Sequence, residues 1–257
     1  MYNFKAIALI QQKGGSGKTT LATNLAAAAC LAGARTLLLD MDRQGSAREW
    51  AVKRPEDSPL RAIDVQHVHA ERGIDRPQFE RLAKGFEVVV LDLPARAPEL
   101  VIRSALVLAT VVVLPVQPMP IDFWASPDTD AYLDQEDAER EQIEQPALPR
   151  LYVLSRAIVG SRLCRDGRAA FDLEAHPACV VHQRIAFAEA AGEGSSVLIS
   201  APEGLAAAEL RIVWRAIERM HGKGTQQKKT KSGRKRSGEP NANGRRATQP
   251  GTRPGLR

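Results

Sequence analysis

Residues 13–19 read Lys-Gly-Gly-Ser-Gly-Lys-Thr, and they separate a short apolar run, 5–10, from an alanine-rich stretch, 18–32. Glycines let the backbone bend into a cradle whose N–H groups face phosphate oxygens, and the N-terminus of a following helix adds partial positive charge. In such a phosphate-binding loop, Lys18 would bridge the β- and γ-phosphates of a nucleotide, and the Thr19 hydroxyl would bind Mg²⁺. The predicted nucleotide-binding residues are Gly14, Gly15, Ser16, Gly17, Lys18, Thr19 and Thr20.

The loop differs from the usual P-loop at its first two positions. The usual loop has a glycine five positions before the Gly-Lys pair, but Gln12 stands there, and an additional lysine, Lys13, follows it. The alternative interpretation, a glycine turn that serves packing alone, is disfavoured because so many of the motif's residue types occur together.

The pattern around the loop predicts a doubly wound α/β domain with a mainly parallel sheet. A strand over 5–10, a helix over 18–32 and a strand over 35–39 form a βαβ unit, whose strands are parallel. Apolar runs such as 88–91 lack alternation, as expected for a sheet covered on both faces. Further strands are expected at 63–68, 87–91, 111–116, 151–154 and 197–199, and helices near 76–84, 97–108, 126–144, 161–174 and 201–220.

Three acidic residues end predicted strands. Asp40 and Asp42 follow the second strand, and Asp92 follows Val-Val-Val-Leu. Ligands of open parallel sheets bind outside the carboxyl ends of the strands, so all three acids are expected beside the phosphate-binding loop. We expect them to hold Mg²⁺, directly or through water, and to orient the attacking water. A lone Asp after a strand is more often a helix cap.

The charge of the chain is unevenly distributed. Its 257 residues carry 36 Lys+Arg and 30 Asp+Glu, a net charge of +6. Residues 221–257 hold 11 of the bases and one acid, a net of +10, which leaves −4 for 1–220. We therefore predict a P-loop ATPase domain over 1–220 and a disordered basic tail over 221–257. The tail is either a solubilising segment or an arm for nucleic-acid phosphates, through Lys228, Lys229, Lys231, Arg234, Lys235 and Arg236. An anionic membrane surface would attract the same residues.

Several other classes of protein are disfavoured. The longest mainly apolar run, 106–116, is too short to span a bilayer, and the start resembles no secretory signal. Three cysteines give no disulfide framework, so a reducing cytoplasm is the expected compartment. The pair His67 and His69 is interpreted as part of an exposed sheet face, and the spacing of His176, Cys179 and His182 as structural. The acidic stretch 126–145, net −7, could attract the basic tail.

The segments Lys13–Thr20 and Asp40–Ser46, with the Asp92 motif, resemble the ParA/MinD family of ATPases with a deviant Walker A motif. Leu114–Trp124 and Gln183–Gly194 are more similar to the shorter, plasmid-type ParA proteins. The resemblance covers about 1–220 and implies ATP and Mg²⁺ as cofactors. It also implies a homodimer in the ATP state, nonspecific DNA binding, and a ParB-like or adaptor partner that stimulates hydrolysis and release. The resemblance therefore implies an ATPase that is cytoplasmic, associated with the nucleoid and not inserted into a membrane.

The same resemblance assigns roles to single residues. Lys13 would reach the partner subunit's phosphates, Asp42 would serve hydrolysis, and Asp92 would be the Walker B acid. Arg184 approximately matches a DNA-contacting arginine, although a surface ion pair would explain it equally. The resulting catalytic set is Lys13, Lys18, Asp40 and Asp42, and the metal set is Thr19, Asp40 and Asp92.

The chain departs from the family pattern in two places, and two alternative functions remain. Asp42-Arg43-Gln44 stands where many members have Asp-Pro-Gln, and Ser155-Arg156 where many have an adenine-contacting Asn-Arg. A small-molecule ligase or synthetase could share the loop, but the chain is short for an added substrate domain. A MinD-like membrane positioner would need an apolar amphipathic C-terminal helix, and the tail has few apolar residues.

Overall fold

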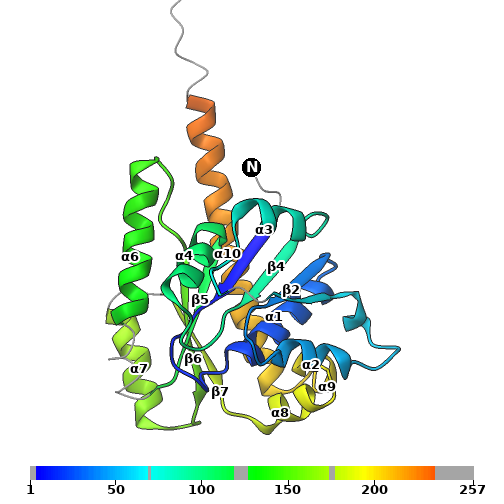
Figure 1. Cartoon of the computed structure of the whole chain (residues 1–257). Helices are drawn as coiled ribbons and strands as arrows, with labels where there is room; N and C mark the ends of the chain where they lie inside the picture. Colours follow the sequence, from blue (N-terminus) through cyan, green and yellow to red (C-terminus); the bar gives the residue numbers. More distant parts are fainter. Residues whose placement is uncertain (1–3, 69–70, 119–126, 174–176, 235–257) are drawn as a thin grey trace, which may run out of the picture. The chain divides into compact units, whose positions relative to one another are not determined.

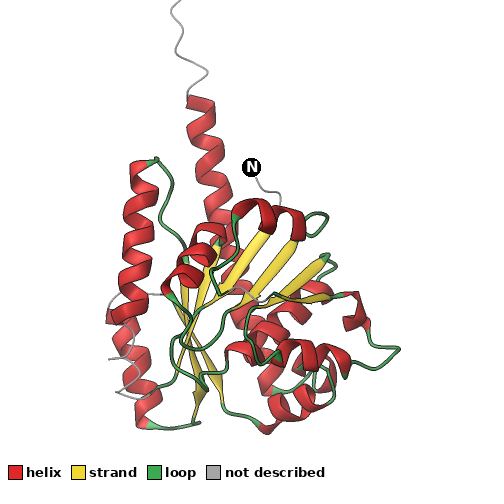
Figure 2. Cartoon of the chain, in the orientation of Figure 1, coloured by secondary structure: helices red, strands yellow, loops and turns green. Residues whose placement is uncertain are grey.

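The computed structural model describes residues 4–68, 71–118, 127–173 and 177–234, and it confirms the α/β class. Within these ranges, seven strands form one parallel sheet in the order β3-β2-β4-β1-β5-β6-β7 (Figures 1 and 2). The strands are β1 (Lys5–Leu9), β2 (Thr36–Asp40), β3 (Asp64–His67), β4 (Val88–Asp92), β5 (Val111–Val116), β6 (Arg150–Ala157) and β7 (Ala178–His182). The helices are α1 (Lys18–Leu31), α2 (Ser46–Val52), η1 (Pro59–Ala62), α3 (Arg76–Leu82), α4 (Glu99–Leu108), α6 (Pro127–Gln142), α7 (Arg162–Leu173), α8 (Ile185–Gly192), α9 (Val197–Ser200) and α10 (Leu205–Arg234).

The core consists of two apolar layers, one on each face of the sheet. Alternate residues of β1 point to opposite faces, so Ile7 and Leu9 join one layer while Ala6 and Ala8 join the other. The first layer includes side chains of α1, α8, α9 and α10, and the second includes side chains of α3, α4, α6 and α7. Burial on both faces explains why the strands read as unbroken apolar runs.

The structure differs from the sequence prediction at several elements. The strand predicted at 197–199 is wrong, because this apolar run forms the short helix α9, whose Ser196 side chain accepts a hydrogen bond from the Leu198 N–H. A run of three apolar residues fits either state, and the serine cap decides it. Strand β7 was not predicted, nor was helix α8, which follows it directly. The short helices α2 and η1 were not predicted either.

Helix α10 also continues beyond its expected end near 220, to Arg234. Extending a formed helix requires no new nucleation, and lysines and glutamines of the added segment favour the helix, although Gly222, Gly224 and Gly233 do not. The first part of the predicted basic tail is therefore helical, and 235–257 lies outside the described residues. Contacts divide the chain into two units, 1–222 and 223–257. None of the helices within the described ranges is both long and apolar enough to cross a membrane.

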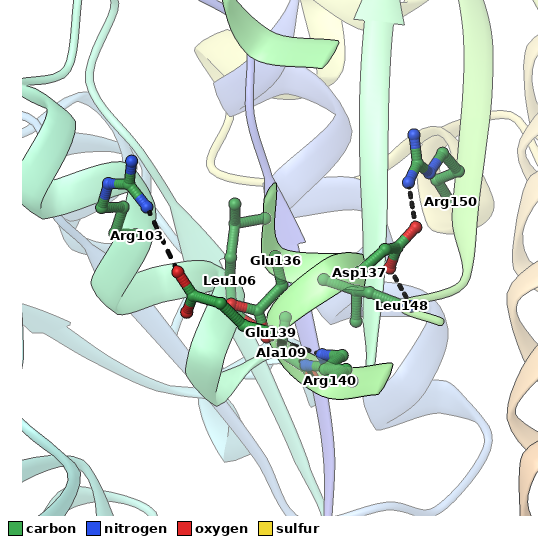
Figure 3. Close-up of polar contacts among 9 residues, drawn as sticks. All are labelled: Arg103, Leu106, Ala109, Glu136, Asp137, Glu139, Arg140, Leu148 and Arg150. Atoms are coloured by element: carbon green, nitrogen blue, oxygen red, sulfur yellow. Dashed lines mark hydrogen bonds and ion pairs between the residues drawn. The ribbon is translucent and has the colours of Figure 1, made fainter. Parts of the chain in front are cut away.

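Acidic helix α6 is attached to its neighbours by arginines. Arg140 donates from Nε to Glu136 at 2.6 Å and from Nη2 to the carbonyls of Leu106 and Ala109, at 3.1 and 3.3 Å, near the end of α4 (Figure 3). The Arg140 and Glu136 side chains are only 13% and 9% exposed, so this pair is shielded from water. Arg140 thus donates to two carbonyls at the end of α4, one of which, that of Leu106, also accepts the Ala109 N–H at 3.3 Å.

Arginines from α4 and β6 neutralise further acids of the same helix. Arg103 of α4 pairs with Glu139, while Arg150 of β6 pairs with Asp137, whose other oxygen accepts the Leu148 N–H at 2.7 Å (Figure 3). These carboxylates therefore fix α6 within 1–222. The attraction of the acidic stretch to the basic tail stays a prediction.

Candidate nucleotide site

The phosphate-binding loop lies between β1 and α1, at the carboxyl edge of the sheet. Gly15 and Gly17 have left-handed φ angles of 76° and 85°, and Gly17 directly precedes α1. A Cβ on Gly17 would lie 2.8 Å from the Ser155 Oγ, so both its conformation and the space around it require glycine. The loop therefore has the sharp curvature that the glycine pattern predicted.

Lys18 is buried within this loop. It is 7% exposed, and its Nζ donates to the Gln11 carbonyl at 2.9 Å. Burial lowers the pKa of Lys18, while the negative charges of Asp92 and Asp42 oppose that shift. The structure thus brings Lys18 close to two of the three predicted acids.

Asp92 ends β4 and has an unusual environment. It is 1% exposed, and neither carboxylate oxygen has a hydrogen-bond partner among the described residues. Burial raises the pKa of Asp92 to about 7, with Asp40 and Asp42 adding to the shift and the Thr19 hydroxyl and Lys18 opposing it. A buried carboxylate that has only the Thr19 hydroxyl as a nearby donor is costly, and a bound cation would satisfy it. The residues present therefore fit a magnesium ion beside Thr19 and Asp92.

Asp40 and Asp42 differ sharply in their partners. The Asp40 carboxylate accepts the N–H groups of Ala47 and Arg48 at 2.9 and 3.0 Å, and that of Asp42 at 3.1 Å. These bonds make Asp40 a cap for the first turn of α2. Asp42 is half-buried, and one of its carboxylate oxygens accepts the Gln44 N–H at 3.0 Å. Asp42 is thus the acid that remains accessible at the edge of the site.

The other predicted loop residues are distributed around the cradle. The backbone N–H of Lys13 donates to the Gln11 side chain at 3.2 Å. The Ser16 hydroxyl is buried and has no hydrogen-bond partner among the described residues. Gly14 is exposed, and the Thr20 carbonyl accepts from Asn24 at 2.7 Å within α1.

Two polar residues at this site were not predicted as functional. Gln117 follows β5, and Arg156 lies within β6, and each donates to the Gly15 carbonyl at 2.8 Å. Their positions at the carboxyl ends of β5 and β6 could have indicated a role at the site, because ligands of such sheets bind there. In the sequence, Arg156 stands out only as part of a departure from the family's Asn-Arg motif.

Arg184 lies directly before α8, as its N-cap residue. Its Nη2 donates to Glu209 of α10 at 2.6 Å, and His182 Nδ1 lies 2.7 Å from the same carboxylate. Hydrogen bonding to Glu209 raises the pKa of Arg184 further. Within 1–222, Arg184 is therefore an ion-pair partner, as the simpler interpretation expected.

The remaining predicted positions are only partly described. Lys228, Lys229, Lys231 and Arg234 fall in the last part of α10, and Lys235 and Arg236 lie outside the described residues, as do His69 and His176. His67 Nε2 lies 2.8 Å from the Asp42 carbonyl oxygen, at the end of β3. Cys179 is buried in β7.

Comparison with known proteins agrees with this geometry. The chain is 27% identical to the maintenance of carboxysome distribution protein A of Halothiobacillus neapolitanus, over 79% of this chain and 91% of that protein. A plasmid partition protein of Borrelia burgdorferi bound to AMPPNP has the same fold, with a TM-score of 0.62 and 15% identity over 86% of this chain and 99% of its own. The septum site-determining protein MinD of Pyrococcus horikoshii complexed with Mg-ADP likewise has a TM-score of 0.62, with 18% identity over 86% of this chain and 98% of its own.

The match to a family model covers nearly all of the unit formed by residues 1–222. The model for the CobQ/CobB/MinD/ParA nucleotide binding domain matches residues 7–222, which include the loop, the three acids and nearly all of the sheet. With the P-loop geometry of Gly17 and Lys18, this match confirms the ParA/MinD resemblance, and the chain belongs to the CobQ/CobB/MinD/ParA family of nucleotide-binding domains.

Proposed function

We propose that this chain is a positioning ATPase that dimerises around ATP, binds DNA nonspecifically and is released from it by hydrolysis. The observation that carries the proposal is the Asp92 carboxylate, which is buried beside the Thr19 hydroxyl and the buried Lys18 and accepts no hydrogen bond of good geometry from the described residues. Such a carboxylate is suited to a phosphate-bound cation rather than to a structural role. The alignment of a nucleotide-binding family over 7–222 supports the same conclusion.

Nucleotide binding rests on the loop and the start of α1. The N–H groups of 14–19 and the N-terminus of α1 face the phosphates, and Lys18 neutralises their charge. Thr19 and Asp92 would hold Mg²⁺, which when bound neutralises charge that develops on the phosphate oxygens. Asp40 is left out of this metal set, because three backbone N–H groups already occupy its carboxylate.

Hydrolysis and dimerisation are assigned to the two remaining charged residues. Asp42 has a half-buried side chain at the edge of the site and orients the attacking water. Lys13 of each subunit completes the phosphate site of its partner, so the dimer depends on the nucleotide. Loss of the γ-phosphate removes this bridge and loosens the dimer.

DNA binding is assigned to the basic residues at the C-terminal end. Residues 223–234 carry Lys and Arg on a helix, and this segment is suited to sequence-independent contact with phosphates. Arg184 contributes only where its pair with Glu209 is exchanged for a DNA phosphate. A ParB-like or adaptor protein would stimulate hydrolysis, and the protein would act in the cytoplasm, on the nucleoid.

The names of similar proteins support positioning as the general role. One is named for carboxysome distribution, one for plasmid partition and one for septum site determination. All three names concern the placement of a large object or structure in a cell. We therefore propose cargo positioning, rather than synthesis of a small metabolite, as the use of the ATPase cycle.

The test is an ATPase assay with and without DNA, combined with ATP-dependent DNA binding. We expect slow hydrolysis that DNA stimulates, and DNA binding with ATP but not with ADP. Turnover that is unaffected by DNA and requires a small metabolite would instead identify a synthetase. Wild-type protein that binds neither nucleotide would reject the whole proposal.

A further inference from the structure

Arg156 is the extra residue of a β-bulge next to the phosphate-binding loop. Along β6 and β7, Ser155 pairs with Val181 and Ala157 with His182, so Arg156 has no partner in the register. Its φ is 55°, in the left-handed region that glycine favours. Bulges between parallel strands are rare, and bulges often redirect a side chain beside a functional site. A strained conformation of this kind persists only where other contacts compensate for it, so the contacts of the Arg156 side chain must account for it.

The guanidinium of Arg156 contacts the loop itself. Its Nη1 donates to the Gly15 carbonyl at 2.8 Å, and the Gln117 Nε2 donates to the same oxygen at 2.8 Å. Gln117 comes from the end of β5 and Arg156 from β6, so two neighbouring strands contact one carbonyl. Both lone pairs of that oxygen are thereby occupied.

Holding this carbonyl also sets the direction of the next N–H. In a trans peptide the C=O of Gly15 and the N–H of Ser16 point in opposite directions. Two donors on one side of the Gly15–Ser16 peptide therefore turn the Ser16 N–H toward the other side. Gly15 itself has a left-handed φ of 76°, which glycine adopts without strain.

We propose that Arg156 is a positioning residue of the nucleotide site: with Gln117 it fixes the Gly15–Ser16 peptide so that its N–H faces the bound phosphates. The bulge directs the guanidinium toward the loop. This arrangement requires the strained, left-handed backbone conformation of Arg156. This inference deepens the proposed function and rests on it for the identity of the ligand. Arg156 acts through the loop and is assigned no contact with the reacting atoms.

The decisive variant is Arg156→Gly, because glycine keeps the left-handed bulge without strain and removes only the side chain. The matched control is Arg96→Gly. Arg96 also has a left-handed φ, 54°, and its backbone N–H donates to the Gln12 carbonyl of the same loop at 3.0 Å. The Arg96→Gly control therefore removes one positive charge and a similar backbone strain beside the loop. The backbone hydrogen bond from residue 96 to the Gln12 carbonyl remains.

The first measurement needs no nucleotide. Amide hydrogen exchange of a peptide that covers 12–18 should be several-fold faster in the Arg156→Gly variant, and unchanged in the Arg96→Gly variant. Thermal unfolding should show that neither variant is less stable than the wild type, since both are relieved of backbone strain. Unchanged exchange in the Arg156→Gly variant, or equal acceleration in both variants, would overturn the proposal.

The second measurement is calorimetric titration with Mg-ADP, which avoids hydrolysis. Arg156→Gly should weaken ADP binding about tenfold, the effect of removing one charge-assisted hydrogen bond, and Arg96→Gly should change it less than about twofold. In the double variant with Gln117→Ala, the effect should differ from the product of the single effects, because both donors share one oxygen. A simple product would overturn the shared contact. Wild-type protein that binds no ADP would reject the proposed function, while the exchange measurement would still decide the role of Arg156.

Discussion

Replacing Asp92 with asparagine should stabilise the nucleotide-free protein, and increasingly so at higher pH. Burial raises the Asp92 pKa from an ordinary value of 3.8 to about 7, so the folded state holds this proton more tightly than the unfolded state does. Stability then falls as pH rises between these two values, because the unfolded chain ionises first. At about 1.36 kcal/mol per pKa unit, the charged carboxylate destabilises the fold by about 4 kcal/mol above pH 7.

The same relation predicts the size of the effect at each pH. At pH 5 the Asp92 contribution is about 2 kcal/mol, and by pH 8 it reaches about 4 kcal/mol. The stability gap between Asp92→Asn and the wild type should therefore widen by about 2–3 kcal/mol over this range. Asparagine also removes a negative charge near Lys18, which reduces the absolute gain but leaves the direction of the pH dependence.

Chemical denaturation at pH 5, 6, 7 and 8, without Mg²⁺ or nucleotide, measures this gap. Asp57→Asn, the same substitution at an exposed position, is the control and should show no widening. A gap that stays constant or narrows with pH would refute the assignment of a buried, unpartnered carboxylate to Asp92. In the ATPase assay the same Asp92→Asn variant should lose activity, because a neutral amide holds Mg²⁺ poorly.

Four further changes test other parts of the structure. Lys13→Gln should spare most ATP binding but abolish ATP-dependent dimers in light scattering, and dimers that persist would refute its role across the interface. Asp42→Ala should accumulate a DNA-bound ATP dimer in a DNA-retention assay, whereas ordinary turnover would place the water-orienting role elsewhere. Arg140→Ala should cost about 3–5 kcal/mol in urea denaturation because it breaks a shielded pair, while Arg162→Ala, from an exposed pair, should cost less than about 1 kcal/mol. Deleting 223–257 should weaken DNA binding and flatten its salt dependence by about 0.9 for each phosphate that the tail neutralises, and an unchanged slope would make the tail a solubiliser.

Local signals were sufficient to predict most of the fold. The runs 111–116 and 88–91 are apolar on both faces, and only a strand covered on two sides needs that pattern. The glycine spacing at 14–17 likewise predicts the loop, because few other residues adopt left-handed φ. The same reasoning was wrong at residues 197–199, which it predicted as a strand. Three apolar residues suit a strand or a helix, and the hydrogen bond that the Ser196 hydroxyl accepts favours the helix.

The site was less predictable, because its chemistry depends on which polar groups find partners. Asp40, Asp42 and Asp92 look alike in the sequence, as acids at the ends of two strands that turn out to be neighbours. In the fold, Asp40 receives three backbone donors, Asp42 one, and Asp92 none from the described residues.

These different partners separate the three acids into a cap, an accessible carboxylate and a buried acceptor suited to a cation. No local pattern around Asp40 distinguishes it from Asp92, because its donors come from Ala47 and Arg48, across a turn whose course the sequence did not predict.

The contacts of Arg156 show the same dependence on long-range pairing. Arg156 lies near the end of β6, and it reaches Gly15 only because β6 lies two strands from β1 and carries a bulge at this position. The bulge is visible in the register between β6 and β7, and β7 was itself not predicted. An arginine in a left-handed conformation is unfavourable locally, so it persists only where a contact made elsewhere offsets the strain. The Gly15 carbonyl provides that contact, which is why removing the guanidinium while keeping the bulge separates the positioning role from the architecture.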